Sequence, residues 1–181
     1  PGTKVKTVNP KKLPMLPRES RYSGDYGLSF TLPGQKITDG KSVAKLFGEM
    51  TRRNVEFFAI VGTNQDGETV SEIIAVGCLT GSLVHPREVV KAAHAHGFNS
   101  FYVVHNHPSG NLAPSPEDVQ LTGRLMEAAQ LSGLDLVGHV IVNGKAYSEF
   151  IDGAAGGWKN NIPFDYAGAP ALEGPLPGRR L

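Results

Sequence analysis

Residues 101–110 of the chain read FYVVHNHPSG, and residues 115–118 read SPED. The first stretch is an apolar run that becomes polar at His105, which predicts a short buried strand followed by a turn at Pro108 and Gly110. The second stretch places a proline and two acidic residues after a serine, which is typical of the start of a helix. A strand, a turn and a helix in this order predict an α/β unit.

Helical and strand patterns alternate on both sides of this unit. Apolar residues at helical spacing predict helices at residues 41–53, 86–96 and 115–132. Runs rich in β-branched and aromatic residues predict strands at 55–62, 69–78, 101–105, 134–142 and 145–150. Asn and Gly between the first two and the last two strands favour antiparallel hairpins. We therefore expect an α/β fold with a mixed β-sheet flanked by helices, a three-layer sandwich.

The chain is expected to have one folded domain, residues 38–150, between two irregular segments. Residues 1–37 form a basic arm with several prolines, and residues 151–181 form a tail rich in Gly and Pro. The first 21 residues carry six basic side chains against one acidic side chain. Such an arm either contacts phosphates or stays solvated, and the lack of an aromatic or helical pattern favours solvation.

Composition excludes several classes of protein. The 181 residues include one cysteine, which excludes a disulfide framework within the chain and any zinc cage built from several cysteines. No apolar run approaches the roughly 18–20 residues that span a bilayer, so we expect a cytoplasmic protein with no membrane partner. The net charge of +1 argues against a surface built wholly for nucleic acid.

His105, His107 and Asp118 together suggest a metal site. Side chains two apart on a strand share a face, and the first turn of the following helix brings Asp118 back toward them. Two imidazoles and one carboxylate would leave the fourth position of a tetrahedral zinc ion for water, which then ionises near neutral pH. Taken alone, Asp118 fits a capping residue better, three positions after the N-cap candidate Ser115. The combination favours the metal site.

Glu72 is an acidic residue within an apolar strand pattern. Burying a carboxylate costs several kcal/mol unless it is paired, neutral or bound to a ligand. Glu72 is therefore either a partly exposed residue near a strand end, or a general base whose pKa is raised by burial. The pattern of residues leaves these two interpretations open.

The spacing of these residues resembles the signature of the JAB/MPN (JAMM) metalloproteases. Glu72, the pair His105 and His107, then Ser115 after seven residues and Asp118 after two more match E…H-x-H-x(7)-S-x(2)-D. The surrounding sequence resembles the RadC family within that group, over roughly residues 40–150. The RadC-like stretches are HPREVV at 85–90, HNHPSG at 105–110, PSPED at 114–118 and HVIV at 139–142.

The resemblance implies a cytidine-deaminase-like α/β/α fold and a zinc ion (Zn2+) held by His105, His107 and Asp118. It also implies that Glu72 is the general acid/base and that Ser115 orients or stabilises the oxyanion as water attacks a carbonyl. The family has Asp at the position of Gly138, and the glycine could remove a partner of His139.

Three functions follow as expectations. The first is a zinc-dependent hydrolase of peptide or isopeptide bonds, with a protein or peptide substrate such as a ubiquitin-like conjugate. The second is a protein of DNA repair, recombination or mobile elements that acts on DNA or on a DNA-bound partner. The third is a non-catalytic scaffold, against which the intact set of signature residues argues.

Overall fold

The computed structural model describes residues 6–7, 28–48, 56–77, 84–151 and 157–163. They form one mixed sheet whose strands follow the order β1-β2-β4-β3-β5-β6-β7-β8. The strands are β1 (Lys6–Thr7), β2 (Leu28–Thr31), β3 (Phe57–Thr63), β4 (Thr69–Val76), β5 (Ser100–Asn106), β6 (Asp135–Val142), β7 (Ala146–Ile151) and β8 (Trp158–Pro163). The helices are α1 (Gly40–Phe47), α2 (Pro86–Ala95) and α3 (Pro116–Leu131).

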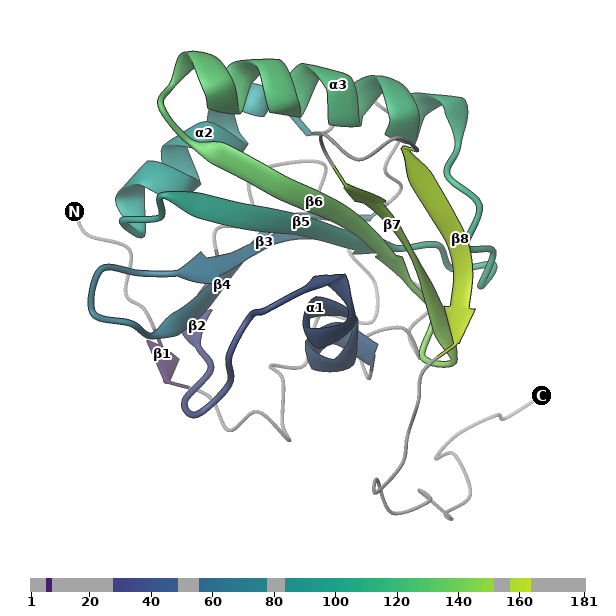
Figure 1. Cartoon of the computed structure of the whole chain (residues 1–181), viewed down its shortest axis with the longest axis horizontal. Coiled ribbons are helices and arrows are strands. Elements are labelled where there is room, and N and C mark those ends of the chain that lie inside the picture. Colours follow the sequence, from purple (N-terminus) through teal and green to yellow (C-terminus); the bar gives the residue numbers. More distant parts are fainter. Residues whose placement is uncertain (1–5, 8–27, 49–55, 78–83, 152–156, 164–181) are drawn as a thin grey trace.

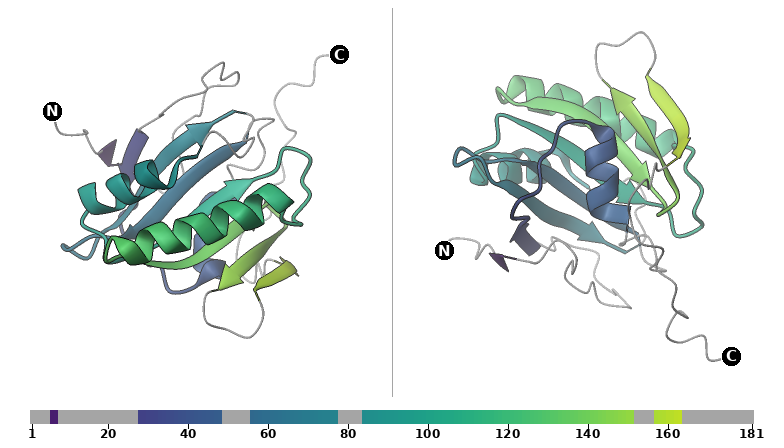
Figure 2. Two further views of the ribbon diagram at one scale, coloured as in Figure 1. Left: turned by 90° about the horizontal axis from the view of Figure 1, so that it is seen from above. Right: turned by 60° about the horizontal axis from the view of Figure 1, so that its bottom comes forward.

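The sheet separates the helices into two layers. Helix α1 covers one face, and α2 and α3 cover the other, as Figures 1 and 2 show. Strand β5 is parallel to β6, whereas β3 is antiparallel to both β4 and β5. The expected α/β fold with a mixed sheet between helices is therefore confirmed. Within the described residues, no helix combines the length and apolar character needed to cross a bilayer.

The sheet extends beyond residues 38–150 at both ends. Strand β2 pairs with β4 and strand β8 pairs with β7, although the sequence pattern predicts irregular structure in both segments. Their short lengths and, in β8, polar residues give little alternation from which to recognise them. The predicted helix over 41–53 is observed as Gly40–Phe47, and the rest of that span beyond residue 48 lies outside the described residues.

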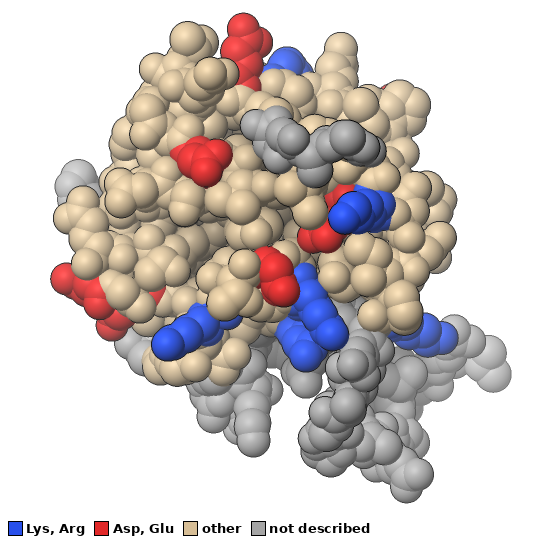
Figure 3. Space-filling view, in the orientation of Figure 1, with Lys and Arg blue, Asp and Glu red and all other residues tan. Residues whose placement is uncertain are grey.

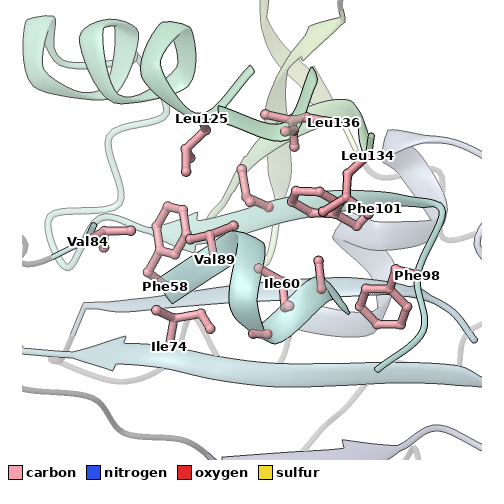
Figure 4. Packing of buried hydrophobic residues seen from close by; sticks show 14 of the residues in the cluster. Phe58, Ile60, Ile74, Val84, Val89, Phe98, Phe101, Leu125, Leu134 and Leu136 are labelled. Atoms are coloured by element: carbon pink, nitrogen blue, oxygen red, sulfur yellow. The ribbon is translucent and has the colours of Figure 1, made fainter. Parts of the chain in front are cut away.

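Strand β5 contributes to the core on both faces of the sheet. Its side chains alternate, so that Tyr102 and Val104 pack on the α1 side. Phe101 and Val103 pack on the other side, in the cluster beneath α2 and α3 that Figure 4 shows. The same alternation directs the next residue on that face, His105, toward the α2 and α3 layer. The polar end of β5 is thus held at a fixed place between apolar layers.

The first residue of α1, Gly40, lies against the side chain of Glu149 from β7. A Cβ atom on Gly40 would overlap the Glu149 carboxylate oxygen Oε2. That side chain is 9% exposed, and burial raises the pKa of Glu149. Only glycine leaves room for a carboxylate at the start of α1, where the helix dipole favours negative charge.

We predict that Gly40→Ala lowers the free energy of unfolding by about 1 kcal/mol, because the largely buried Glu149 side chain must leave its rotamer to clear the helix start. Gly123→Ala is the matched control, since Gly123 is an exposed glycine inside α3 with open space at its Cβ position. The control should gain up to about 1 kcal/mol from helix propensity. Urea denaturation measures both, and a Gly40→Ala variant as stable as the wild type would contradict the prediction.

Candidate metal centre

Two imidazoles meet at the end of β5. His105 is the penultimate residue of the strand and is 1% exposed, while His107 lies in the turn that follows. Their Nε2 atoms are 3.0 Å apart. The turn is closed by a hydrogen bond from the Gly110 N–H to the His107 carbonyl, with Gly110 at a φ of 79°. Positive φ favours glycine, so the residue that ends the HNHPSG stretch helps to fold the turn.

Helix α3 brings the Asp118 carboxylate to the same point. Oδ2 of Asp118 lies 3.1 Å from His107 Nε2, and Oδ1 lies 3.2 Å from His105 Nε2. A capping box holds the carboxylate: the Ser115 N–H donates to Oδ2 (2.7 Å), and the Asp118 N–H donates to Ser115 Oγ (3.1 Å). The two sequence interpretations of Asp118 therefore describe one side chain, which caps the helix and faces the imidazoles.

The geometry of the three groups fits a small tetrahedral cation. His105 Nε2 lies 3.0 Å from His107 Nε2 and 3.2 Å from Asp118 Oδ1, and His107 Nε2 lies 3.1 Å from the other carboxylate oxygen, Oδ2. Zinc bonds of 2.0–2.1 Å in tetrahedral geometry separate neighbouring ligand atoms by about 3.3 Å. His107 Nδ1 lies 2.7 Å from the Asn111 carbonyl, which can only accept, so in the neutral ring the Nε2 lone pair faces the centre.

Charge also prepares this centre for a cation. Burial by itself raises the pKa of Asp118, but the hydrogen bonds with His105 and His107 outweigh it and hold that pKa far below its usual range. The Asp118 carboxylate in turn raises the pKa of His107. Asp118 is therefore ionised at neutral pH and supplies the negative charge that a divalent cation requires.

A second layer of polar groups lies behind His105. His139 of β6 is fully buried, and its Nε2 is 2.7 Å from His105 Nδ1. Its other nitrogen, Nδ1, is 2.7 Å from Thr122 Oγ1 on α3. Burial lowers the pKa of His139 well below its ordinary value. Both ring nitrogens of His139 are therefore paired, with His105 and Thr122, although residue 138 is a glycine.

The structure does not bring Glu72 to this centre. On β4, Glu72 is opposite Ile60 of β3, whereas His105 of β5 is opposite Phe58, two residues earlier in β3. Two strand spacings and this offset separate the Cα atoms of Glu72 and His105 by more than about 10 Å. The Glu72 carboxylate instead lies 2.5 Å from His96 Nε2, at the end of α2, and accepts from Ser29 Oγ (3.2 Å). The assignment of the base to Glu72 is corrected on these grounds.

Glu56 is a second acidic residue, besides Asp118, that the structure places beside the histidines. Ligand atoms of Glu56, His105 and His107 all lie within 4.8 Å of one another. Glu56 directly precedes β3, and the Phe57 N–H donates to the buried Asn106 Oδ1 (2.8 Å). This bond ties the start of β3 to the end of β5. In the sequence, Glu56 lies at the start of the strand predicted over 55–62, and only the antiparallel pairing of β3 with β5 brings it to the histidines.

Sequence comparison relates this chain to known proteins. The sequence model of the family described as the RadC-like JAB domain matches residues 37–154. A UPF0758 protein of Staphylococcus carnosus is 39% identical over 120 residues, which cover 65% of this chain and 53% of the relative. A UPF0758 protein of Bacillus licheniformis is 41% identical over 103 residues, 56% of this chain and 46% of the relative.

A third UPF0758 protein, from Caldanaerobacter subterraneus, is 44% identical over 98 residues, 54% of this chain and 42% of its own length. The chain thus spans about half the length of the curated relatives that it matches. The match covers the sheet from α1 to β7, and with it both histidines and the start of α3. The chain belongs to the RadC family, and residues 37–154 are its RadC-like JAB domain.

Proposed function

We propose that this chain is a zinc-dependent hydrolase of peptide or isopeptide bonds. The observation that carries the proposal is the convergence of His105, His107 and Asp118, with every pair of these side chains within 3.2 Å. Glu56 adds a carboxylate beside the pair of histidines. Three neutral or anionic ligands with one further acidic group are the components of a hydrolytic zinc site.

The residues of the site have two kinds of role: some would hold the zinc ion, and others would transfer protons or stabilise charge. Nε2 of His105, Nε2 of His107 and the Asp118 carboxylate would hold zinc. A zinc ion in such a site lowers the pKa of water to about 7 and polarises a substrate carbonyl. The remaining steps are proton transfers and charge stabilisation, for which the chain supplies Glu56 and Ser115.

Glu56 takes the role of general base. Its carboxylate accepts the proton of the attacking water and returns it to the amine that leaves when the C–N bond breaks. Ser115 accepts the Asp118 N–H at its Oγ, and a hydroxyl that accepts can still donate its hydrogen to the carbonyl oxygen of the substrate. Ser115 thus keeps the oxyanion role expected from the resemblance and also orients Asp118.

The substrate class proposed is a protein or peptide, with a ubiquitin-like conjugate among the candidates. A role on DNA rests on the basic arm, most of which lies outside the described residues. On the face shown in Figure 3, basic side chains are interspersed with acidic ones among the described residues. That arrangement gives the nucleic-acid function no further support.

We predict that Asp118→Ala abolishes tight zinc binding and costs about 1–2 kcal/mol of stability through loss of the helix cap. Elemental analysis of protein purified without added metal or a histidine tag, followed by zinc titration, measures the metal. Asp39→Ala is the control, because Asp39 is the acidic member of the capping box of α1, where it holds the N-cap position, whereas Asp118 holds the N3 position of α3. The control should lose similar stability and keep its zinc. Full zinc occupancy in Asp118→Ala would contradict the ligand assignment.

We also predict that Glu56→Gln keeps zinc but lowers hydrolysis by about 10²–10⁴-fold, because the amide cannot accept the proton. Glu72→Gln is the comparison, and it should keep the hydrolysis rate while changing the contact with His96. Turnover of a panel of quenched peptides and lysine isopeptides reports the rates. Loss of activity in Glu72→Gln with normal turnover in Glu56→Gln would restore the original assignment.

A further inference from the structure

We propose that Thr122 and His139 are positioning residues that fix the tautomer of His105, so that its Nε2 lone pair faces the metal position. The inference rests on the proposed zinc site and assigns a role to two residues outside its ligand set. It follows from the direction of three hydrogen bonds that run from the backbone of α3 to His105. We refer to these three hydrogen bonds as the Thr122–His139 hydrogen-bond series.

The first hydrogen bond sets the donor-to-acceptor direction of the whole Thr122–His139 hydrogen-bond series. Thr122 Oγ1 donates to the Asp118 carbonyl oxygen, 2.7 Å away in the preceding turn of α3. A carbonyl oxygen can only accept, and a hydroxyl has a single hydrogen. Oγ1 of Thr122 must therefore accept in its second contact, the 2.7 Å approach to His139 Nδ1. That nitrogen carries a hydrogen.

The second and third bonds follow from the first. His139 is fully buried, and a neutral imidazole holds one hydrogen, which Nδ1 already carries. Nε2 of His139 is consequently an acceptor, and His105 Nδ1, 2.7 Å away, is the donor. The single hydrogen of neutral His105 then resides on Nδ1. Its Nε2 presents a lone pair toward His107 and Asp118.

The two histidines are thus oriented by different means. A backbone carbonyl, that of Asn111, orients His107, whereas two side chains orient His105. All three members of the His105 network are at most 2% exposed, so water does not compete for these bonds. Trp158 packs beside the His139 ring, with 5.2 Å between ring centroids. Side-chain variants can therefore test the orientation of His105 without altering a ligand.

Thr122→Val tests the Thr122–His139 hydrogen-bond series, because valine keeps the shape of the threonine side chain and lacks its hydroxyl. His139 is then no longer held with its hydrogen on Nδ1. When that hydrogen moves to Nε2, His139 donates to His105 Nδ1, and the hydrogen of His105 moves to Nε2, where it blocks the lone pair. Thr122→Ser retains the hydroxyl and should preserve the Thr122–His139 hydrogen-bond series.

The experiment measures zinc affinity by competition with a chromophoric chelator, and the His105 tautomer by ¹⁵N NMR at pH 8 without metal. We expect Thr122→Val to bind zinc about 10–100-fold more weakly, as for other partners of metal ligands, and Thr122→Ser to stay near wild type. In the wild type, the His105 hydrogen should reside on Nδ1, and in Thr122→Val it should be shared between the two nitrogens. Ser71→Ala is the matched control, since Ser71 is a buried hydroxyl that donates to the Ile60 carbonyl (2.8 Å) on the neighbouring strand. It should lose stability only.

The outcomes separate this inference from the proposed function. A folded Thr122→Val protein with an unchanged His105 tautomer and wild-type zinc affinity would overturn the inference. Zinc binding that follows the expected order, without hydrolysis of any peptide or isopeptide, would leave the inference standing and contradict the proposed function. If the wild type binds no zinc, the tautomer of His105 in Thr122→Val and Thr122→Ser still decides the inference.

Discussion

The hydrogen bond from the Ser115 N–H to the Asp118 carboxylate is the contact on which the centre depends. It forms at the start of α3, where unpaired N–H groups and the helix dipole both favour a negative charge. The bond holds Oδ2 of Asp118 beside His107, and the second oxygen then faces His105. The side chain of Asp118 thus has two roles: it accepts a hydrogen bond at the start of α3, and it supplies the negative charge of the metal centre. Both the fold and the chemistry therefore require a carboxylate at this position.

Burial explains why so many polar groups around the centre are paired. β5 runs through the middle of the sheet, with apolar clusters on both faces, so an unpaired imidazole there would cost several kcal/mol. Asn106 accepts from the Phe57 N–H, and His139 links His105 to Thr122. The same bonds that satisfy buried groups also orient them. Stability and preorganisation therefore have a common origin in this part of the molecule.

The general base is assigned to Glu56 and not to Glu72, and this difference shows that a local sequence pattern does not determine which acidic residue lies at the metal centre. Glu72 is an acidic residue in a largely apolar strand, and it lies on the same face of the sheet as His105. Its place along that face is beside His96, near the end of α2, and this pairing accounts for a carboxylate in a largely apolar strand. Glu56 stands at a strand boundary, where an acidic residue is unremarkable in sequence. Its relation to His105 depends on which strand pairs with β5 and in which register.

Local features of the sequence determined the central elements, both hairpins, the turn after β5 and the cap of α3. Each depends on neighbouring residues: apolar periodicity, turns that contain Asn and Gly, a glycine at positive φ and a serine before an acidic turn. Even the approach of Asp118 to the two histidines follows from one short strand-turn-helix segment. Strand order and register, by contrast, join residues far apart in the chain. Only the tertiary structure decided that Glu56 lies at the centre, that β2 and β8 extend the sheet, and that His139 lies behind His105. Those contacts arise from the packing of whole layers, which local periodicity does not specify.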